Sequence, residues 1–326
     1  MAENTITGLI PEIYEALDIV SRELTGMIPS ATMNASSNTA AVGQAIRIDV
    51  EPAGNVSNIA PAMTVPDPTG QTSGFTDIII TKSRAAEFGF LGEDQKGLNT
   101  GAGYGTVRAN KIAQAIRAVT NEVETDLCGL QSTFSRAHGT AGTAPFGTAN
   151  DYTDASNVLK ILKDNGSPLQ DNQLVINTTA GVNLLGKQAA VADAGSDSIL
   201  RQGVLLDING MPIRESAQIV DQAAGGIAGA ATTNAAGYAV GANVLTLAAG
   251  GTGNVVAGDV VTFAGDTNKY VVASAVFAGV NPAAGDTITL AAPGLRVAMT
   301  AATKAITKIA ASSRNMAFNR SAIVLA

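Results

Sequence analysis

Charge is what this sequence has least of. Charged residues fill 14% of its 326 positions, whereas about 25% is usual in a soluble domain. A free monomer stays soluble through a charged surface, so we expect a chain this poor in charge to cover much of its outside against neighbours. The net charge of −7 and the pI near 4.8 argue against a dedicated nucleic-acid surface, because such surfaces are basic.

Side chains that build metal and nucleophile sites are also scarce. The chain has one cysteine, Cys128, and one histidine, His138. These counts exclude an internal disulfide framework, a cysteine zinc site and a histidine metal cluster. We interpret Cys128 as a small buried apolar residue and His138 as a cap on a helix C-terminus. The carboxylates show no pair whose spacing indicates acid–base chemistry, so the sequence predicts no catalytic residue, cofactor or metal, and not an enzyme.

Long apolar segments are missing as well. The stretch 227–251 is a mixture of Ala, Gly and Thr interrupted by Asn234 and Tyr238, so it does not predict a transmembrane helix. The first residues lack the basic-then-apolar pattern of a signal peptide. We therefore expect synthesis and function on the cytoplasmic side, with no membrane partner.

Two segments near the N-terminus are predicted to depend on contact with another part of the fold or with a partner. Within residues 4–28, Ile13, Leu17 and Val20 recur at helical spacing, but a helix this short is marginal without a surface to lie on. Within residues 44–82, the runs AIRIDVE and FTDIIITK alternate like half-buried strands around a Pro- and Gly-rich stretch. An isolated hairpin is poorly stable in water, so we interpret this segment as a two-stranded loop ordered by partners; a disordered surface excursion is the alternative. Its strand charges are predicted to contact neighbouring subunits: Arg47, Asp49, Glu51 and Asp77.

The strongest periodic signal predicts one long helix over residues 104–137. Seven apolar residues are spaced by three or four positions and fall on one helix face, which core packing explains. A coiled coil is disfavoured because the opposite face has no ordered charge pattern. The predicted core face consists of Ile112, Ile116, Val119, Val123, Leu127, Leu130 and Phe134.

The second half of the chain changes character at Asp221. Before it, residues 151–221 predict one compact α/β domain, with a helix capped by Asp154, a buried strand LVINTT, a helix AGVNLLGKQAAV and a hairpin turn at Asn209 and Gly210. From 222 to 310 the short runs NVLTLA, DVVTFA, KYVVASAV and DTITLA, separated by turns, predict a small β-barrel or sandwich. Strand character at 322–325 suggests that this β-module is inserted before a last strand of the preceding domain.

Taken in order, these elements resemble the coat proteins of tailed bacteriophages, in particular podovirus-type coats with an extra β-domain. The resemblance covers nearly the whole chain. It is carried by GLIPEIYEAL, the two-stranded excursion containing TVPDP, RANKIAQAIRAVTNEVETDL, VLKILKDNGSP with NQLVINTTAG, the β-module with AGDVVTFAG and KYVVAS, and NMAFNRSAIVLA.

The resemblance implies an α+β fold, the tailed-phage major capsid fold shared with herpesviruses. Hexamers and pentamers of one chain would then tile an icosahedral shell around double-stranded DNA, with scaffolding and portal proteins as partners, a possible decoration protein, and only weak nonspecific contact with DNA. Some members of this family carry a covalent Lys–Asn cross-link between subunits, but no local pattern in this sequence identifies such a pair. The implied parts are an N-terminal arm (1–43), an extended loop (44–82), a peripheral domain (83–150) with spine helix 104–137, an axial domain (151–221), an inserted β-domain (222–310) and a returning C-terminal strand (311–326).

Two other classes stay open on the sequence alone. A tail, tube or adhesin protein would fit the Ala-, Gly- and Thr-rich β-module, although the long helix argues against it. An enzyme acting on carbohydrate or peptide would need carboxylates that meet only in space. The first expectation remains a structural protein of the virion capsid that assembles with itself.

Overall fold

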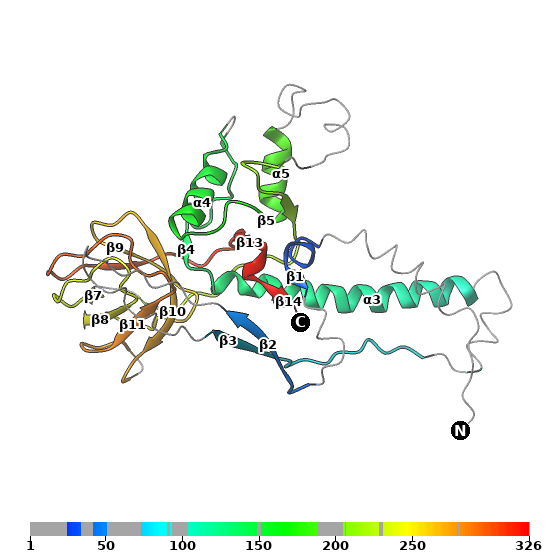
Figure 1. The fold of residues 1–326 in the computed structure, drawn as a ribbon, viewed down its shortest axis with the longest axis horizontal. Coiled ribbons are helices and arrows are strands. Elements are labelled where there is room, and N and C mark those ends of the chain that lie inside the picture. The colour runs from blue at the N-terminus through cyan, green and yellow to red at the C-terminus, as the bar shows by residue number, and fades with distance from the viewer. Residues whose placement is uncertain are drawn as a thin grey trace, which may run out of the picture.

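The computed structural model describes most of the chain outside its N-terminal segment. Figure 1 shows one long helix, α3, as the axis of the molecule, with a β-barrel at its C-terminal end, an α/β unit on one side and a two-stranded ribbon on the other. The described residues are 25–33, 42–50, 73–89, 92, 104–148, 151–187, 205, 207–227, 231–279 and 281–325. The predicted helix within 4–28 lies almost wholly outside them.

Helix α3 runs from Tyr104 to Gly129, and one 3-10 turn, η3 (Leu130–Ser132), follows it. At about 1.5 Å per residue its 26 residues span about 39 Å. The predicted extent of 104–137 is wrong at its C-terminal end, because Arg136–Ala137 forms strand β4 and pairs with strand β10 of the barrel. Glycine is a poor helix former, and the strand pairing outweighs the apolar periodicity that continued past Gly129.

The α/β unit is a three-stranded sheet with helices α4 (Thr153–Asp164) and α5 (Thr178–Lys187). Its strand order is β13-β5-β6, with β5 (Asn172–Ile176) in the middle, parallel to β6 (Ile213–Glu215) and antiparallel to β13 (Met316–Asn319). All five residues of β5 are buried, as expected for a strand covered on both faces.

Two apolar clusters fill the two sides of this sheet. On one side Val175 packs with Leu127 and Cys128 of α3. On the other, Leu174 and Ile176 pack with residues of α4 and α5. Because successive side chains of a strand point to opposite faces, β5 contributes to both clusters and so connects α3 to the α/β unit.

Some local predictions for this unit hold and one does not. Asn209 and Gly210 have φ of 55° and 73° and stand between the paired residues Ile208 and Met211, as the hairpin prediction requires. Asp154, however, is not the cap of α4. Its carboxylate accepts a hydrogen bond from the Phe146 N–H at 2.8 Å, while Asp151 accepts from the Thr153 N–H at 2.8 Å.

The β-module is a sheet that closes on itself. Its strand order is β12-β9-β10-β11-β8-β7, with β4 added beside β10. The edges meet where Thr232 bridges Ala305 and the Thr233 N–H donates to the Lys304 carbonyl at 2.9 Å. The strands are β7 (Thr232–Thr233), β8 (Val244–Ala249), β9 (Val260–Phe263), β10 (Lys269–Val276), β11 (Thr287–Leu290) and β12 (Ile306–Lys308).

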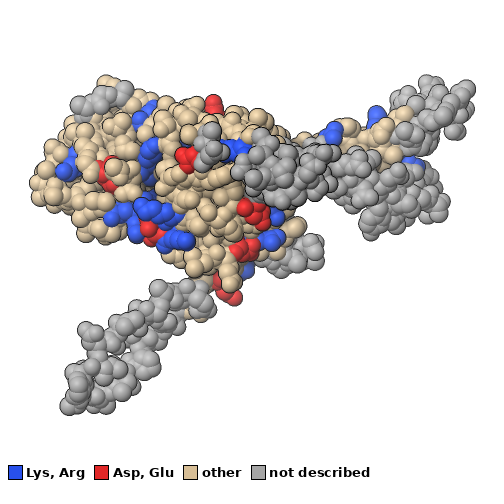
Figure 2. Space-filling model, turned by 90° about the horizontal axis from the view of Figure 1, so that it is seen from above, with Lys and Arg blue, Asp and Glu red and all other residues tan. Residues whose placement is uncertain are grey.

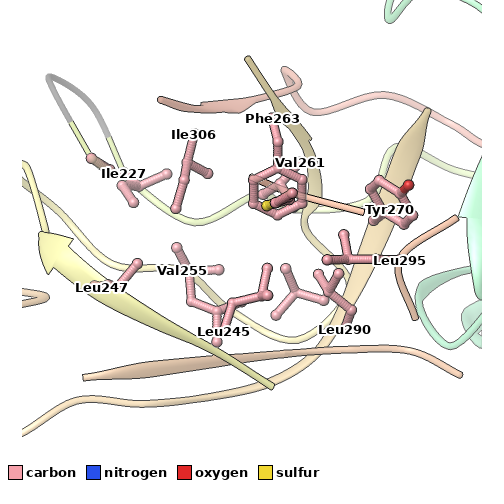
Figure 3. Close-up of a cluster of buried hydrophobic side chains, with 14 residues drawn as sticks. Ile227, Leu245, Leu247, Val255, Val261, Phe263, Tyr270, Leu290, Leu295 and Ile306 are labelled. Carbon is pink, nitrogen blue, oxygen red and sulfur yellow. The ribbon is translucent and has the colours of Figure 1, made fainter. Parts of the chain in front are cut away.

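The barrel has its own apolar core. Figure 3 shows its inward side chains, among them Leu245, Val261 and Leu290, each at most 1% exposed. Phe263 and Tyr270 pack with ring centroids 5.8 Å apart. The alternation of buried with partly or fully exposed residues in β8 and β11 follows from the period of two in a strand with one face in the core.

After the barrel the chain returns to the α/β unit. Strand β13 pairs with β5, and β14 (Val324–Leu325) pairs in parallel with β1 (Thr32–Met33) near the N-terminus. From the sequence we expect the last strand at 322–325. The strand that joins the main sheet is instead Met316–Asn319, in which the buried residues Met316 and Phe318 alternate with partly exposed ones.

Candidate functional site: an anchored N-terminal segment and an exposed ribbon

A buried carboxylate fixes the N-terminal segment to helix α3. Glu124 is 0% exposed. Its Oε1 accepts hydrogen bonds from the N–H groups of Gly26 and Met27, both at 2.8 Å, and its Oε2 accepts one from the Ile28 N–H at 3.0 Å. Three charge-assisted hydrogen bonds compensate for the loss of water around the carboxylate. The chain is thereby held to α3 where the 3-10 turn η1 (Ile28–Ser30) begins.

Close packing around Gly26 completes this anchor. A Cβ atom at Gly26 would stand 2.7 Å from the Glu215 carbonyl oxygen and 2.8 Å from Val175 Cγ1, so no larger residue fits without movement. Pro29 lies in the first turn of η1, where a missing N–H costs nothing.

The ribbon is the second feature. Strands β2 (Ala45–Val50) and β3 (Gly74–Ile79) pair antiparallel over six positions, with Ile46 opposite Ile78 and Arg47 opposite Asp77. One face therefore carries Ile46, which is 8% exposed, while the other carries Phe75 and Ile79, which are 55% and 58% exposed. The described part of the chain leaves that second face open.

The predicted contact charges of the ribbon lie as follows. Arg47 Nε stands 3.2 Å from Asp77 Oδ1, and its guanidinium lies 3.6 Å from the centre of the Phe75 ring. These two charges thus meet each other within one chain, because directly opposite residues on a strand pair share a face. Asp49 is exposed on the same face, opposite Phe75. Glu51 lies outside the described residues.

The segment after the ribbon is held along α3 by ion pairs. Lys82 Nζ is 2.6 Å from Asp126 Oδ2, and Arg84 Nε is 2.8 Å from Glu122 Oε1. Two residues of extended chain advance about as far as one helical turn, so this spacing matches an extended segment running antiparallel to the helix. The two ion pairs therefore attach the chain that follows the ribbon to α3.

The predicted core face of α3 divides into three parts. Val123, Leu127, Leu130 and Phe134 contact the cluster shared with the α/β unit. Ile112 and Ile116 form a small separate cluster with Ala113. Val119, between them, is 36% exposed, so its assignment to the core is wrong: the part of the chain that the structure describes offers it little cover.

The structure shows the surroundings of the single cysteine and the single histidine. Cys128 is 1% exposed, and burial raises the pKa of its thiol to about 11. His138 follows β4 rather than ending a helix, as the helix stops earlier; its Nε2 is 3.8 Å from Asp154 Oδ1. In the described residues no group of three or more His, Cys, Asp or Glu side chains is arranged to hold a metal ion.

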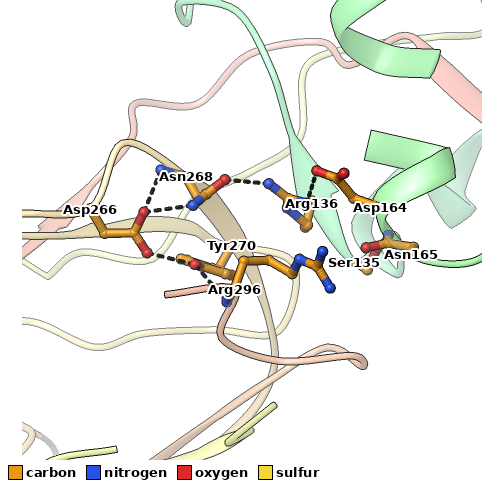
Figure 4. A network of polar contacts seen from close by, with 8 residues as sticks. All are labelled: Ser135, Arg136, Asp164, Asn165, Asp266, Asn268, Tyr270 and Arg296. Carbon is orange, nitrogen blue, oxygen red and sulfur yellow. Dashed lines mark hydrogen bonds and ion pairs between the residues drawn. The ribbon is translucent and has the colours of Figure 1, made fainter. Parts of the chain in front are cut away.

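A polar network joins the barrel to the α/β unit (Figure 4). Arg136 of β4, with a side chain only 5% exposed, donates to Asn268 Oδ1 in the barrel and stands 3.5 Å from Asp164 Oδ2 at the end of α4. Asp266 accepts from the Tyr270 hydroxyl at 2.6 Å. Burial raises the pKa of Tyr270 to about 12, so the hydroxyl stays a donor at ordinary pH.

The face of the molecule shown in Figure 2 is mostly uncharged. Its Lys, Arg, Asp and Glu side chains lie near one another in small mixed groups rather than in a broad basic area. Within the described part of the chain, no helix is both long and apolar enough to cross a membrane.

The comparisons with known proteins find likenesses in structure only. No family model and no curated protein matches the sequence. The chain is similar to a chain of Mycobacterium phage Che8 (15% identity, 91% of each chain covered, TM-score 0.46). It is similar to the capsid of cyanophage P-SCSP1u (15%, 96% and 92%, 0.39) and to the mature capsid of bacteriophage PhiM1 (13%, 97% and 90%, 0.43). All three are structures of bacteriophages.

Proposed function

We propose that this chain is the major capsid protein of a tailed bacteriophage, a structural protein whose copies form hexamers and pentamers in an icosahedral shell around double-stranded DNA. The observation that carries the proposal is the open face of the β2–β3 ribbon, where Phe75 and Ile79 are more than half exposed. A two-stranded ribbon with an apolar face is marginal in water. A neighbouring copy that covers this face would supply the missing stability.

The order of the elements supports the same reading. The arm (1–43) and the loop (44–82) would reach over adjacent subunits, starting from the Glu124 anchor and from the base of the ribbon. Helix α3 would be the spine of the peripheral domain (83–150). Residues 151–221 would form the axial domain at capsomer centres, 222–310 the inserted β-domain, and 311–326 the returning strand.

The proposed partners follow from charge and from shell geometry. Copies of the chain are the main partner; scaffolding and portal proteins act during assembly, and a decoration protein is compatible with the outer surface. A net charge of −7 leaves only weak, nonspecific contact with packaged DNA. The proposed location is the virion capsid, with synthesis and assembly in the host cytoplasm, and the proposal includes no catalysis, cofactor or metal.

Negative-stain electron microscopy and light scattering on the full chain test the proposal. We expect closed, uniform shells, either alone or with a scaffolding partner. A protein that stays monomeric at high concentration in both conditions contradicts it. Open tubes of constant diameter would instead favour the tail-tube alternative.

A further inference from the structure

The barrel is attached to the rest of the chain by two connections that lie side by side. Gln222, before the barrel, pairs with Ser312, after it, through a hydrogen bond of 3.2 Å from the Gln222 N–H to the Ser312 carbonyl. Two adjacent connections define one hinge axis, and on their own they would let the barrel swing about it.

A third attachment is separate in sequence from these two connections. Strand β4, which follows α3 and η3, adds to the barrel at β10, with Ala137 opposite Lys269 and Arg136 opposite Tyr270. The Val271 N–H also donates to the Ser135 carbonyl at 3.1 Å. A third attachment restricts the rotation that two adjacent connections alone would allow.

Beside these attachments, the barrel contacts the end of α3 at Gly258. A Cβ atom there would stand 2.7 Å from Ser132 Cβ, so the barrel rests directly on η3 at the end of α3. Arg314 Nη1 donates to the Gly258 carbonyl at 2.6 Å, and the Arg314 N–H donates to Gln131 Oε1 at 3.0 Å. The Gln131 amide in turn donates to the Val220 carbonyl at 2.9 Å.

We propose that Gln131, Ser132, Gly258 and Arg314 form a clamp that locks the barrel to the end of α3, so that helix and barrel move as one rigid lever. The lock uses backbone groups and buried polar atoms, which makes its geometry specific. If the proposed function holds, copies in different shell positions could not change the tilt of the barrel without rotating α3. Differences in conformation between those copies would then be confined to the ribbon and the arm.

Electron-paramagnetic-resonance distance measurements on the unassembled full chain test the clamp without requiring a shell. Spin labels at Ala118→Cys on α3 and Thr307→Cys on β12, both exposed positions, report the distance between helix and barrel. Buried Cys128 is shielded from the label. We expect one narrow distance distribution, and a broad one in this parent protein overturns the proposal whatever happens in assembly.

Two glycines provide a matched pair of variants. Gly258 and Gly265 have nearly equal φ values of +91° and +89°, but a Cβ at Gly265 meets nothing within 4 Å. Gly258→Ala and Gly265→Ala therefore carry the same backbone strain, and only the first pushes against Ser132. We expect Gly258→Ala to widen the distribution about twofold or more, because the new methyl group separates the barrel from η3, and Gly265→Ala to leave it narrow. Equal widths in both variants overturn the clamp.

If Gly258→Ala does not fold, Arg314→Leu replaces it. This variant removes the side-chain hydrogen bond to the Gly258 carbonyl and keeps the backbone bond to Gln131. Circular dichroism checks its fold. A folded Arg314→Leu protein with a widened distribution supports the clamp, and one with the parent's narrow distribution counts against it.

Discussion

Glu124 shows how much one residue can determine in this molecule. Its carboxylate is fully buried, and it accepts hydrogen bonds from three backbone N–H groups. In sequence it is one of three carboxylates within five residues, Glu122, Glu124 and Asp126, and no local pattern marks it as buried. Only its contact with residues 26–28, which lie nearly a hundred positions earlier in the sequence, makes Glu124 an anchor.

We predict that Glu124→Gln strongly destabilises the fold. The amide keeps the shape but turns an –NH₂ group toward backbone N–H donors, which leaves buried donors without acceptors and costs about 3 kcal/mol. Urea unfolding measures the change. The control is Glu122→Gln, whose partner Arg84 is on the surface, and its expected cost is below about 1 kcal/mol. Equal costs for the two variants would refute the anchor.

Cys128 gives the fold a measurable dependence on pH. Burial raises the pKa of its thiol from 9.0 to about 11, so the folded state holds the proton more tightly than the unfolded state does. The resulting stabilisation is complete below pH 9 and is lost as the pH rises toward 11.

We predict that the stability difference between the parent protein and Cys128→Ala shrinks by up to about 2 kcal/mol between pH 8 and pH 10.5. Tyr270, whose pKa is also raised, titrates in both proteins and cancels in the comparison. Urea unfolding at a series of pH values provides the data. A difference that does not vary with pH would mean that the thiol ionises as freely in the folded state as in the unfolded one.

At the scale of elements, two glycines at the ends of segments have opposite roles. Gly26→Ala should destabilise the chain by about 2 kcal/mol, because the new methyl group overlaps the Glu215 carbonyl and Val175. Gly129→Ala should stabilise it by up to about 1 kcal/mol, since the last residue of α3 has open space around it and alanine favours helix. Thermal unfolding compares the two. A destabilising Gly129→Ala would show that the end of α3 needs glycine.

The ribbon can be tested by exchanging its paired charges. Asp77→Arg alone places two cations opposite each other and should reduce assembly. The double variant Arg47→Asp, Asp77→Arg restores the pair within the chain and should recover most of it, although such an exposed pair is worth less than about 1 kcal/mol. Shell yield by sedimentation measures both. Failure of the double variant to recover would indicate that these charges contact a neighbouring copy instead.

Local patterns predicted elements well, and contacts between distant segments limited the rest. The alternation of β2, β3, β8 and β11 and the turn at Asn209–Gly210 follow from short-range chemistry. The end of α3 was missed because β4 gains its pairing from β10, more than 130 residues later. The Glu124 anchor and the contact between Gly258 and Ser132 were missed for the same reason: neither has a local signal.

At the scale of the whole molecule, separate apolar cores are connected by polar contacts. The barrel core and the clusters around β5 share no residues, and the joint between them consists of strand pairing, Arg136 and the clamp. The described surface adds exposed apolar side chains to a chain that has few charges. Association between copies should therefore depend mainly on burying apolar surface.

Salt tests this last point. Raising sodium chloride from about 0.05 to about 0.5 M shortens the Debye length about threefold, so an association driven by charge would weaken steeply. We predict that the association constant of this chain changes by less than about threefold over that range, and that sulfate strengthens association, because excluded salts favour apolar burial. Light scattering across both salts measures it. Shells that dissolve in sodium chloride would mean that ion pairs between copies, rather than apolar faces such as that of the ribbon, hold them together.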